Sequence, residues 1–283
     1  MSFEFPEDEM RRMGATTEIL PHETSANKRE VVAETEVPSV RKYESPPEVR
    51  NPKEDVLVSR DKTSSKKIGR GITDSSFIEL KDDGKGIFKT EGCFNERAAY
   101  LIDRFLGFNL VPPTVIRQVD GDIGSVQEFI PDTKMADELE DSGWWSYKKR
   151  CHDELAKMWI FDMIINNKDR HPGNFLVKDK KKIYAIDHGR SLGYSKGSFE
   201  HIDFEEGWHT FFDEQLPRDT KESLKKFLEK QTEQKILEDL LSELYDREKA
   251  VAILKRIKYF AKLISANGEI PPTERGVIKI SEL

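Results

Sequence analysis

Asn167-Lys-Asp-Arg-His-Pro-Gly-Asn-Phe-Leu176 and the shorter Ile186-Asp-His-Gly189 are the two stretches that decide the expected fold of this chain. Either stretch alone could be an ordinary surface loop, because Asn, Asp, Pro and Gly are residues that build turns. Their order makes them informative: Asp169 comes five residues before Asn174, and Asp187 follows at the end of a predicted hairpin. Since a hairpin returns the chain to its starting edge, these three polar side chains are expected in one site.

The hairpin is predicted from two apolar runs, Phe175–Val177 and Ile183–Ile186, which flank the polar segment Lys178–Lys182. Before it, Glu154–Asn166 carries Leu, Met, Trp and Ile at helical spacing, which predicts a buried helix face. After it, repeated apolar residues predict three further helices, at Leu224–Leu228, Ile236–Leu244 and Ala250–Ile264. Residues 131–283 are therefore expected to form a mainly helical lobe with one hairpin.

Residues 61–130 instead show the pattern of a small sheet around one helix. Ser76–Leu80 alternates between polar and apolar residues, and Gly86–Lys89 is expected as the returning strand after a turn. Phe94–Phe105 has apolar residues at helical spacing, and Gly107 suits the end of that helix. Two more strands are expected at Val111–Arg117 and Ser125–Ile130. The expected fold class is α+β, with a strand-rich N-terminal lobe ahead of the helical lobe.

Residues 1–60 differ in composition from the rest of the chain. They contain six of its thirteen prolines, many Glu, Ser and Thr, three aromatic residues and no Trp. Such a segment cannot bury enough apolar surface to offset the entropy lost on ordering. We therefore predict that residues 1–60 are mostly disordered and form a solvated tail. A docking or regulatory arm is the alternative.

The composition argues against several classes of protein. No apolar run approaches the roughly 18 residues that span a bilayer, and the N-terminus lacks the pattern of a signal peptide. The net charge of -7 argues against nucleic acid as a partner and against stable association with anionic membranes. Cys93 and Cys151 form neither a disulfide framework nor a zinc pattern, and the histidine spacings match no zinc site. A cytoplasmic protein is the simplest interpretation.

The polar residues of the two stretches match the needs of phosphoryl transfer. One carboxylate must orient the attacking hydroxyl and accept its proton, while an amide and a second carboxylate hold Mg²⁺ against the phosphates. Asp169 suits the first role, and Asn174 and Asp187 supply the hard oxygen ligands that Mg²⁺ prefers. The offset between Asp169 and Asn174 is also that of the Asp and Asn in the H-R-D-x-x-x-x-N loop of kinases. ATP and Mg²⁺ are therefore expected to bind.

Asp169-Arg-His-Pro-Gly-Asn174 and Ile186-Asp-His-Gly189 resemble the D-R-H-x-x-N and D-x-G motifs of the phosphatidylinositol 3- and 4-kinase-like superfamily. That grouping includes the HipA-type serine/threonine kinases. The resemblance spans roughly residues 66–264, although only the motif segments are sharp. It implies a bilobal fold like that of protein kinases, with the nucleotide between the lobes.

The resemblance also implies roles for single residues. By this similarity Asp169 is the catalytic aspartate, and Asn174 and Asp187 are the metal ligands. Arg170 and His171 are expected beside the transferring phosphate.

Three further residues are expected to support this centre. The resemblance implies a phosphate-anchoring lysine on a strand, for which Lys89 fits, and an acidic partner on the next helix, for which Glu96 fits. The carboxylate would hold the ammonium in place for the nucleotide phosphates. Asp162, on the helix before the loop, is expected to brace that loop, for example against Arg170 or a backbone N–H.

Two segments complete the expected nucleotide site. Gly69–Ser76 would cover the phosphates, because small residues let backbone N–H groups approach phosphate oxygens. Its expected contacts are Gly71, Ser75 and Ser76. The segment is neither G-x-G-x-x-G nor a Walker A motif, so a plain flexible loop is the alternative. Val126–Pro131 resembles the hinge between lobes, with adenine at the backbone of Glu128 and Ile130; an ordinary strand ending at a proline is the alternative.

The region after Asp187 selects the phosphate acceptor in such kinases. Gly197–Pro217 holds six acidic residues and no Lys or Arg, so an anionic phosphoinositide headgroup would be repelled there. A solvated acidic face remote from the cleft is the alternative. We therefore expect a serine/threonine protein kinase that acts on a protein partner, which could be the chain itself. A kinase for phosphoinositides or other small molecules, and a nucleotide-binding pseudokinase scaffold, are the alternatives.

Overall fold

The computed structural model describes residues 43–68, 75–139, 150–167, 169–179, 181–193 and 216–267. Two parts of the expected site lie outside these residues. One is Gly71 together with most of the expected phosphate-covering loop, and the other is nearly all of the acidic segment Gly197–Pro217.

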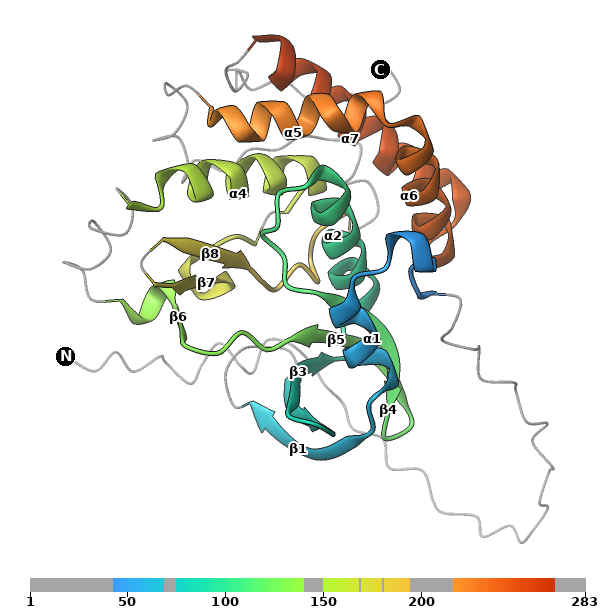
Figure 1. The fold of residues 1–283 in the computed structure, drawn as a ribbon, viewed down its shortest axis with the longest axis vertical. Helices are drawn as coiled ribbons and strands as arrows, with labels where there is room; N and C mark the ends of the chain where they lie inside the picture. Colours follow the sequence, from blue (N-terminus) through green and yellow to red (C-terminus); the bar gives the residue numbers. More distant parts are fainter. Residues whose placement is uncertain are drawn as a thin grey trace, which may run out of the picture. The chain divides into compact units, whose positions relative to one another are not determined.

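The N-terminal lobe is built on a five-stranded antiparallel sheet (Figure 1). Its strands are β1 (Lys62–Ile68), β2 (Ser75–Leu80), β3 (Gly84–Lys89), β4 (Thr114–Val119) and β5 (Asp122–Glu128), in the spatial order β1-β2-β3-β5-β4. The register pairs Ser75 with Lys89 and Lys89 with Ser125. Because paired residues share a face, these three side chains lie on one side of the sheet and Phe88 lies on the other.

Two helices flank this sheet. Helix α2 (Cys93–Leu106) follows β3 and ends, as predicted, at Gly107, whose φ of 72° is the left-handed conformation that glycine adopts without strain. Helix α1 (Pro52–Ser59) contacts β3, β4 and β5, and its Leu57 packs with Phe88 and Val126 in a small core of its own. Helix α2 lies instead on the face that carries Lys89, because Glu96 on its first turns pairs with that lysine.

The prediction of disorder is wrong for residues 43–60. A short 3-10 helix, η3 (Pro47–Val49), leads into α1, where Asn51 caps the helix by accepting a hydrogen bond from Lys53 N at 3.0 Å. Pro52 suits the first turn of a helix, where its missing N–H needs no partner. Few apolar residues are buried here, so the compositional signal was weak. The segment folds because a buried carboxylate, Glu54, joins it to α2.

The C-terminal lobe combines a second sheet with helices. The sheet has the order β6-β7-β8, and its predicted hairpin is β7 (Phe175–Lys178) and β8 (Lys182–Ala185), with β6 (Thr133–Met135) added at the edge. Helix α4 (His152–Ile165) is buried over most of its surface, because it contacts both β8 and α7 (Figure 1). The three later helices are α5 (Arg218–Glu229), α6 (Gln231–Leu244) and α7 (Arg247–Asn267). Two short 3-10 helices are η4 (Ala136–Glu138) and η5 (Pro172–Asn174).

The expected α+β fold is therefore confirmed, with a strand-rich lobe followed by a helical lobe. Within the part of the chain that the structure describes, no helix has both the length and the apolar character needed to cross a bilayer.

Candidate functional site

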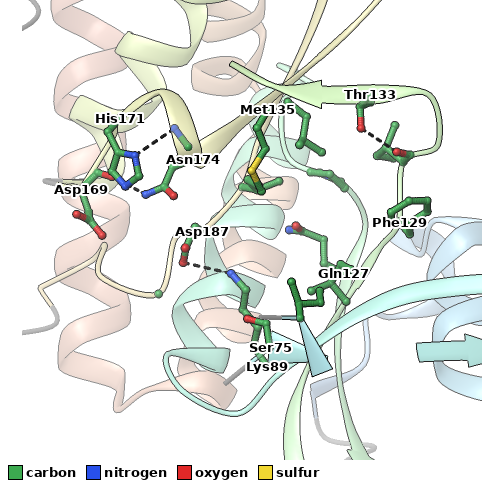
Figure 2. Close-up of a pocket in the computed structure, with 18 of the residues that line it drawn as sticks. Ser75, Lys89, Gln127, Phe129, Thr133, Met135, Asp169, His171, Asn174 and Asp187 are labelled. Atoms are coloured by element: carbon green, nitrogen blue, oxygen red, sulfur yellow. Dashed lines mark hydrogen bonds and ion pairs between the residues drawn. The ribbon is translucent and has the colours of Figure 1, made fainter. Parts of the chain in front are cut away.

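A cavity of about 690 Å³ is lined by residues of both lobes. Ile87, Lys89 and the segment from Gln127 to Ile130 come from the first sheet and the strand end that follows it. The loop ahead of β7 contributes Asp169, His171 and Asn174, and the segment after β8 contributes Asp187. Figure 2 shows Asp169, His171 and Asn174 at one end of this cavity and Phe129 and Thr133 at the other. Residues separated by up to about 100 positions in the sequence thus form one site.

Lys89 and Glu96 form the ion pair that was predicted. Lys89 Nζ lies 3.0 Å from Glu96 Oε1, and it also lies 3.2 Å from Asp187 Oδ1 (Figure 2). Burial alone would lower the pKa of Lys89, but the two carboxylates outweigh it and raise that pKa above its usual value. Burial alone would raise the pKa of Glu96, but Lys89 and His188 hold it far below its usual range. Both groups are therefore charged at neutral pH, and the ammonium is fixed at the cavity wall.

Asp169 and Asn174 are held together by the loop between them. Asn174 Nδ2 donates to the carbonyl oxygen of Asp169 at 2.7 Å, and Asp169 N donates to Asn167 Oδ1 at 3.1 Å. Since the amide nitrogen of Asn174 is committed to the loop, its Oδ1 is the atom left to face the cavity. This orientation turns Asn174 into an oxygen donor at the site.

Asp187 has a backbone φ of 59°, which is uncommon for residues other than glycine. Such a conformation costs of order 1–3 kcal/mol and persists where surrounding contacts enforce it, often at functional sites. Here the conformation accompanies a half-buried carboxylate that lies beside Lys89 and borders the cavity.

Arg170 lies in the support of the loop, not beside the cavity as was expected. It is buried and does not line the cavity; its Nη1 donates to the carbonyl oxygens of Asn174 and Ile186, and its Nε lies 2.8 Å from Asp162 Oδ2. The prediction that Asp162 braces this loop through Arg170 is confirmed. Arg170 therefore ties the loop before β7 to the strand end after β8.

His171 does line the cavity, as expected. Its Nδ1 accepts a hydrogen bond from Gly173 N at 3.1 Å, which fixes the ring across the start of η5 (Figure 2). Arg190, which the sequence analysis did not select, also lines the cavity, and its Nη1 lies 3.7 Å from Asp169 Oδ2.

The expected phosphate-covering segment meets the cavity at one described residue. Ser75 lines the cavity, because it pairs with Lys89 on the cavity face of the sheet. Ser76 pairs with Phe88 and therefore has its side chain on the opposite face, and it does not line the cavity. The Ser76 side chain is therefore not part of the cavity wall, and the expected nucleotide contact of Ser76, which relied on backbone N–H groups, stays a prediction.

The end of β5 carries the backbone groups expected for the hinge. Glu128 N donates to the carbonyl oxygen of Pro113 at 2.7 Å, and Phe129 N donates to that of Lys85 at 3.1 Å. In an antiparallel ladder Pro113 would return a hydrogen bond to the Glu128 carbonyl, but proline has no N–H. The Glu128 carbonyl is thus left without a ladder donor, in a residue that lines the cavity. Ile130 lines the same end, where its carbonyl accepts from Thr133 Oγ1 at 3.0 Å.

Helix α2 is attached to the segment that follows Asp187. Asn95 Nδ2 donates to the carbonyl oxygens of Gly189 and Ser191, at 2.7 and 3.0 Å. His188 is fully buried between Glu96 and Arg170. Sequence reasoning did not select Asn95 or His188 for a role. The available signal was their position, since each stands next to a selected acidic residue.

Comparison with known proteins finds similarity over the region that carries these motifs. The profile of the phosphatidylinositol 3- and 4-kinase family matches residues 117–261. Phosphatidylinositol 4-kinase gamma 4 of Oryza sativa subsp. japonica is 31% identical over 138 residues, covering 41% of this chain and 23% of that protein. Protein Rv2133c of Mycobacterium tuberculosis is 30% identical over 126 residues, covering 34% of this chain and 45% of that protein. The chain thus spans less than half of either relative.

Among solved structures, the Golgi casein kinase has a similar fold. The TM-score is 0.53 at 19% sequence identity, with 83% of this chain and 78% of that chain covered. At this level of identity the likeness concerns the fold, which is the bilobal fold of protein kinases.

Proposed function

The chain belongs to the phosphatidylinositol 3- and 4-kinase family and is a phosphotransferase, and from this we propose that it transfers the terminal phosphate of ATP to a hydroxyl group. One observation carries the proposal. Lys89, Asp169, Asn174 and Asp187 reach a single cavity from three separate segments, with the charges that phosphoryl transfer requires.

The adenine end of the nucleotide belongs at the end of β5. The Glu128 carbonyl, which Pro113 leaves without a donor, is suited to accept a hydrogen bond from the amino group of adenine. Guanine carries an oxo group at the equivalent ring position and would place an acceptor against this acceptor. The site is therefore proposed to prefer ATP to GTP.

The phosphate end belongs beside Lys89. Its ammonium is held by Glu96, whose carboxylate is itself buried, so the positive charge has a fixed position and a short reach into the cavity. Ser75 stands opposite Lys89 on the neighbouring strand and adds a hydroxyl to the same wall.

The donor set fits a divalent cation such as Mg²⁺. Asn174 Oδ1 and the Asp187 carboxylate are hard oxygen donors, and both residues line the cavity. In the described residues no group of three or more His, Cys, Asp or Glu side chains could hold a metal ion. Such a cation would take its other ligands from phosphate oxygens and water, as Mg²⁺ commonly does. When bound, it neutralises charge on the transferring phosphate.

Asp169 is the group proposed to act on the acceptor. Its carboxylate lines the cavity near Asn174 and is more than a third exposed, so an incoming hydroxyl can reach it. Asp169 orients that hydroxyl toward the terminal phosphate and takes its proton as the new P–O bond forms. The bond between that phosphorus and the bridging oxygen of ADP breaks in the same transfer.

The proposed acceptor is a serine or threonine of a protein, which could be the chain itself. The support is the acidic composition of Gly197–Pro217, which disfavours an anionic headgroup and favours a basic peptide. A second candidate acceptor is a phosphoinositide, because relatives that match part of this chain are named phosphatidylinositol 4-kinases.

The test is incubation with γ-labelled ATP and Mg²⁺, with wild type beside Asp169→Asn, read by intact mass and by extraction of phosphoinositide vesicles. Asp55→Asn, an exposed carboxylate on α1, is the matched control. Labelled protein in wild type and the control but not in Asp169→Asn would support the proposal, and labelled lipid alone would select the second acceptor. Nucleotide binding without transfer to protein, lipid or water would refute the proposal and favour a pseudokinase scaffold.

A further inference from the structure

The backbone at the start of α2 lies very close to the backbone of the segment Asp187–Gly189. A Cβ atom placed on Gly92 would lie 2.6 Å from Gly189 Cα, so no side chain larger than hydrogen fits between the two backbones. Asn95 bonds the carbonyl oxygen of the same Gly189. The side chain inside this contact is His188, which is fully buried.

The two ring nitrogens of His188 face different partners. His188 Nε2 lies 3.0 Å from Arg170 Nη2, and His188 Nδ1 lies 3.6 Å from Glu96 Oε2. A guanidinium can only donate, so Nε2 must be the acceptor and the ring proton must reside on Nδ1. That proton is directed at Glu96.

The two atoms at the longer separation have no hydrogen-bond partner in the described part of the chain. Both His188 Nδ1 and Glu96 Oε2 are buried, and the 3.6 Å between them is longer than a hydrogen bond. Buried polar atoms in proteins are nearly always paired, because an unpaired one loses its hydration without compensation. The His188 ring is therefore the side chain that faces Glu96 Oε2 at the shortest separation the structure gives, and the backbone N–H of His188 also acts on the Glu96 carboxylate.

These side-chain contacts form a continuous network that connects the two lobes. Lys89 is joined to Glu96 at 3.0 Å, Glu96 faces His188 at 3.6 Å, His188 meets Arg170 at 3.0 Å, and Arg170 meets Asp162 at 2.8 Å. At one end of this network, Glu96 fixes the position of the Lys89 ammonium that is proposed to bind the phosphates. At the other end, Arg170 fixes the position of the loop that carries Asp169 and Asn174.

We propose that His188 is a positioning residue that fixes the Lys89–Glu96 pair relative to the loop of Asp169 through its two ring nitrogens. Its role in catalysis rests on the proposed function, whereas its structural role does not. Space filling is the competing explanation, because the ring also packs edge-on against Phe161 at 5.8 Å between centroids.

Two substitutions distinguish the contributions of the two ring nitrogens of His188. In His188→Asn the amide nitrogen takes the place of Nδ1, so the donor to Glu96 is kept and the acceptor for Arg170 is lost. In His188→Gln the longer side chain places its amide oxygen near Nε2, so the acceptor for Arg170 is kept and the donor to Glu96 is lost.

The first readout is hydrogen–deuterium exchange of the protein without nucleotide. His188→Gln is expected to speed exchange in the first turns of α2, and His188→Asn is expected to speed it in residues 169–176. Equal changes in both segments for both variants, or no change in either, would overturn the proposal in favour of space filling.

The second readout is kinetic. His188→Gln is expected to raise KM for ATP about tenfold or more, with a smaller change in kcat. His188→Asn is expected to lower kcat about tenfold or more, with a smaller change in KM. A tenfold effect corresponds to about 1.4 kcal/mol. Parallel losses in the two variants would contradict the proposal. If wild type transfers no phosphate, the proposed function fails while the exchange measurement still decides the role of His188.

A measurement on wild type needs no variant to fold. In ¹⁵N spectra of histidine-labelled protein, the His188 ring is expected as the neutral tautomer with its proton on Nδ1. A proton on Nε2, or on both nitrogens, would overturn the proposal.

Discussion

The carboxylate of Glu54 should be among the most sensitive single groups for stability in this fold, although it lies ahead of every predicted element. Glu54 is 2% exposed, and Arg97, with which its Oε2 pairs at 2.9 Å, is fully buried. The other donors to this carboxylate are Ser45 Oγ at 2.9 Å, Tyr100 Oη at 3.0 Å, Arg104 Nη1 at 2.5 Å and Asn51 N at 3.1 Å. Burial alone would raise the pKa of Glu54, but Arg97 and these hydrogen bonds hold it below its usual value.

Glu54→Gln keeps the shape of the side chain and removes its charge. The Arg97 guanidinium then stays buried with a neutral amide as its partner. Removing one partner of a buried ion pair typically costs about 3–5 kcal/mol, because the remaining charge is uncompensated. For a domain of this size each kcal/mol lowers the unfolding midpoint by about 2–4 °C, so a fall of roughly 6–20 °C is expected.

The assay is thermal and urea unfolding followed by circular dichroism. Asp55→Asn is the matched control, since Asp55 is the next residue of α1, is 58% exposed and, among the residues that the structure describes, has an ion pair with Arg50 alone. Surface pairs of this kind contribute about 0–1 kcal/mol, so the control should unfold close to wild type. If Glu54→Gln unfolds within about 1 kcal/mol of Asp55→Asn, the reasoning that a buried charge network holds α1 on the fold is refuted.

Three further predictions follow from single contacts. Gly92→Ala should lower the free energy of unfolding and the kinase activity more than the control Gly121→Ala. Both glycines have a positive φ, 63° at Gly92 and 96° at Gly121, but only at Gly92 would the new Cβ contact backbone atoms. Equal effects of the two substitutions in unfolding and activity assays would contradict this reasoning. Asp103 is buried and its pKa is raised to about 7, so between about pH 4 and 7 the folded state binds an extra proton and loses stability from this group as pH rises. In urea titrations, the free energy of unfolding of Asp103→Asn relative to wild type should therefore rise by at least about 1 kcal/mol between about pH 4 and 7. A difference between the two proteins that does not change with pH would contradict this prediction. ATP should bind the cavity about tenfold or more tightly than GTP, because leaving the Glu128 carbonyl without a donor costs about 1–3 kcal/mol. Equal competition by the two nucleotides in a displacement assay would contradict the assignment of the adenine site to the end of β5.

Local pattern was sufficient for the elements that position the site. The apolar runs on either side of Lys178–Lys182 predicted the β7–β8 hairpin, and that hairpin by its geometry returns Asp187 to the neighbourhood of Asn174. Helical spacing predicted α2 almost to the residue, and because Lys89 ends the strand before it, Glu96 on its first turns lies within reach. The elements themselves follow from periods of two and 3.6 residues, which are visible in a single sequence, whereas the choice of Lys89 and Glu96 as partners came from the resemblance to the kinase superfamily.

Other features depend on pairing between distant segments and leave no local pattern. Ser75 and Ser76 are adjacent and alike in chemistry, and only the register of β2 against β3 decides that Ser75 faces the cavity. Arg170 could have faced the phosphate or the protein interior, and the choice is made by Asp162 and by two carbonyl groups that β7 and β8 bring together. Helix α1 was not predicted because its stability depends on the carboxylate of Glu54, whose arginine partners lie some 40 to 50 residues away in the sequence.

The charges on α2 make the cavity sensitive to residues outside it. Glu96 and Arg97 are neighbours in sequence, so their side chains leave the helix about 100° apart. Glu96 points to Lys89 and His188, and Arg97 points to Glu54 on α1. A rotation of α2 that removed Glu96 from Lys89 would also draw a fully buried guanidinium away from its carboxylate, which the cost of an uncompensated buried charge opposes. The segment Tyr43–Ser59 therefore stabilises the rotational position of the helix that positions the phosphate-anchoring lysine. Loosening the segment should weaken that ion pair, although no residue of the segment lines the cavity.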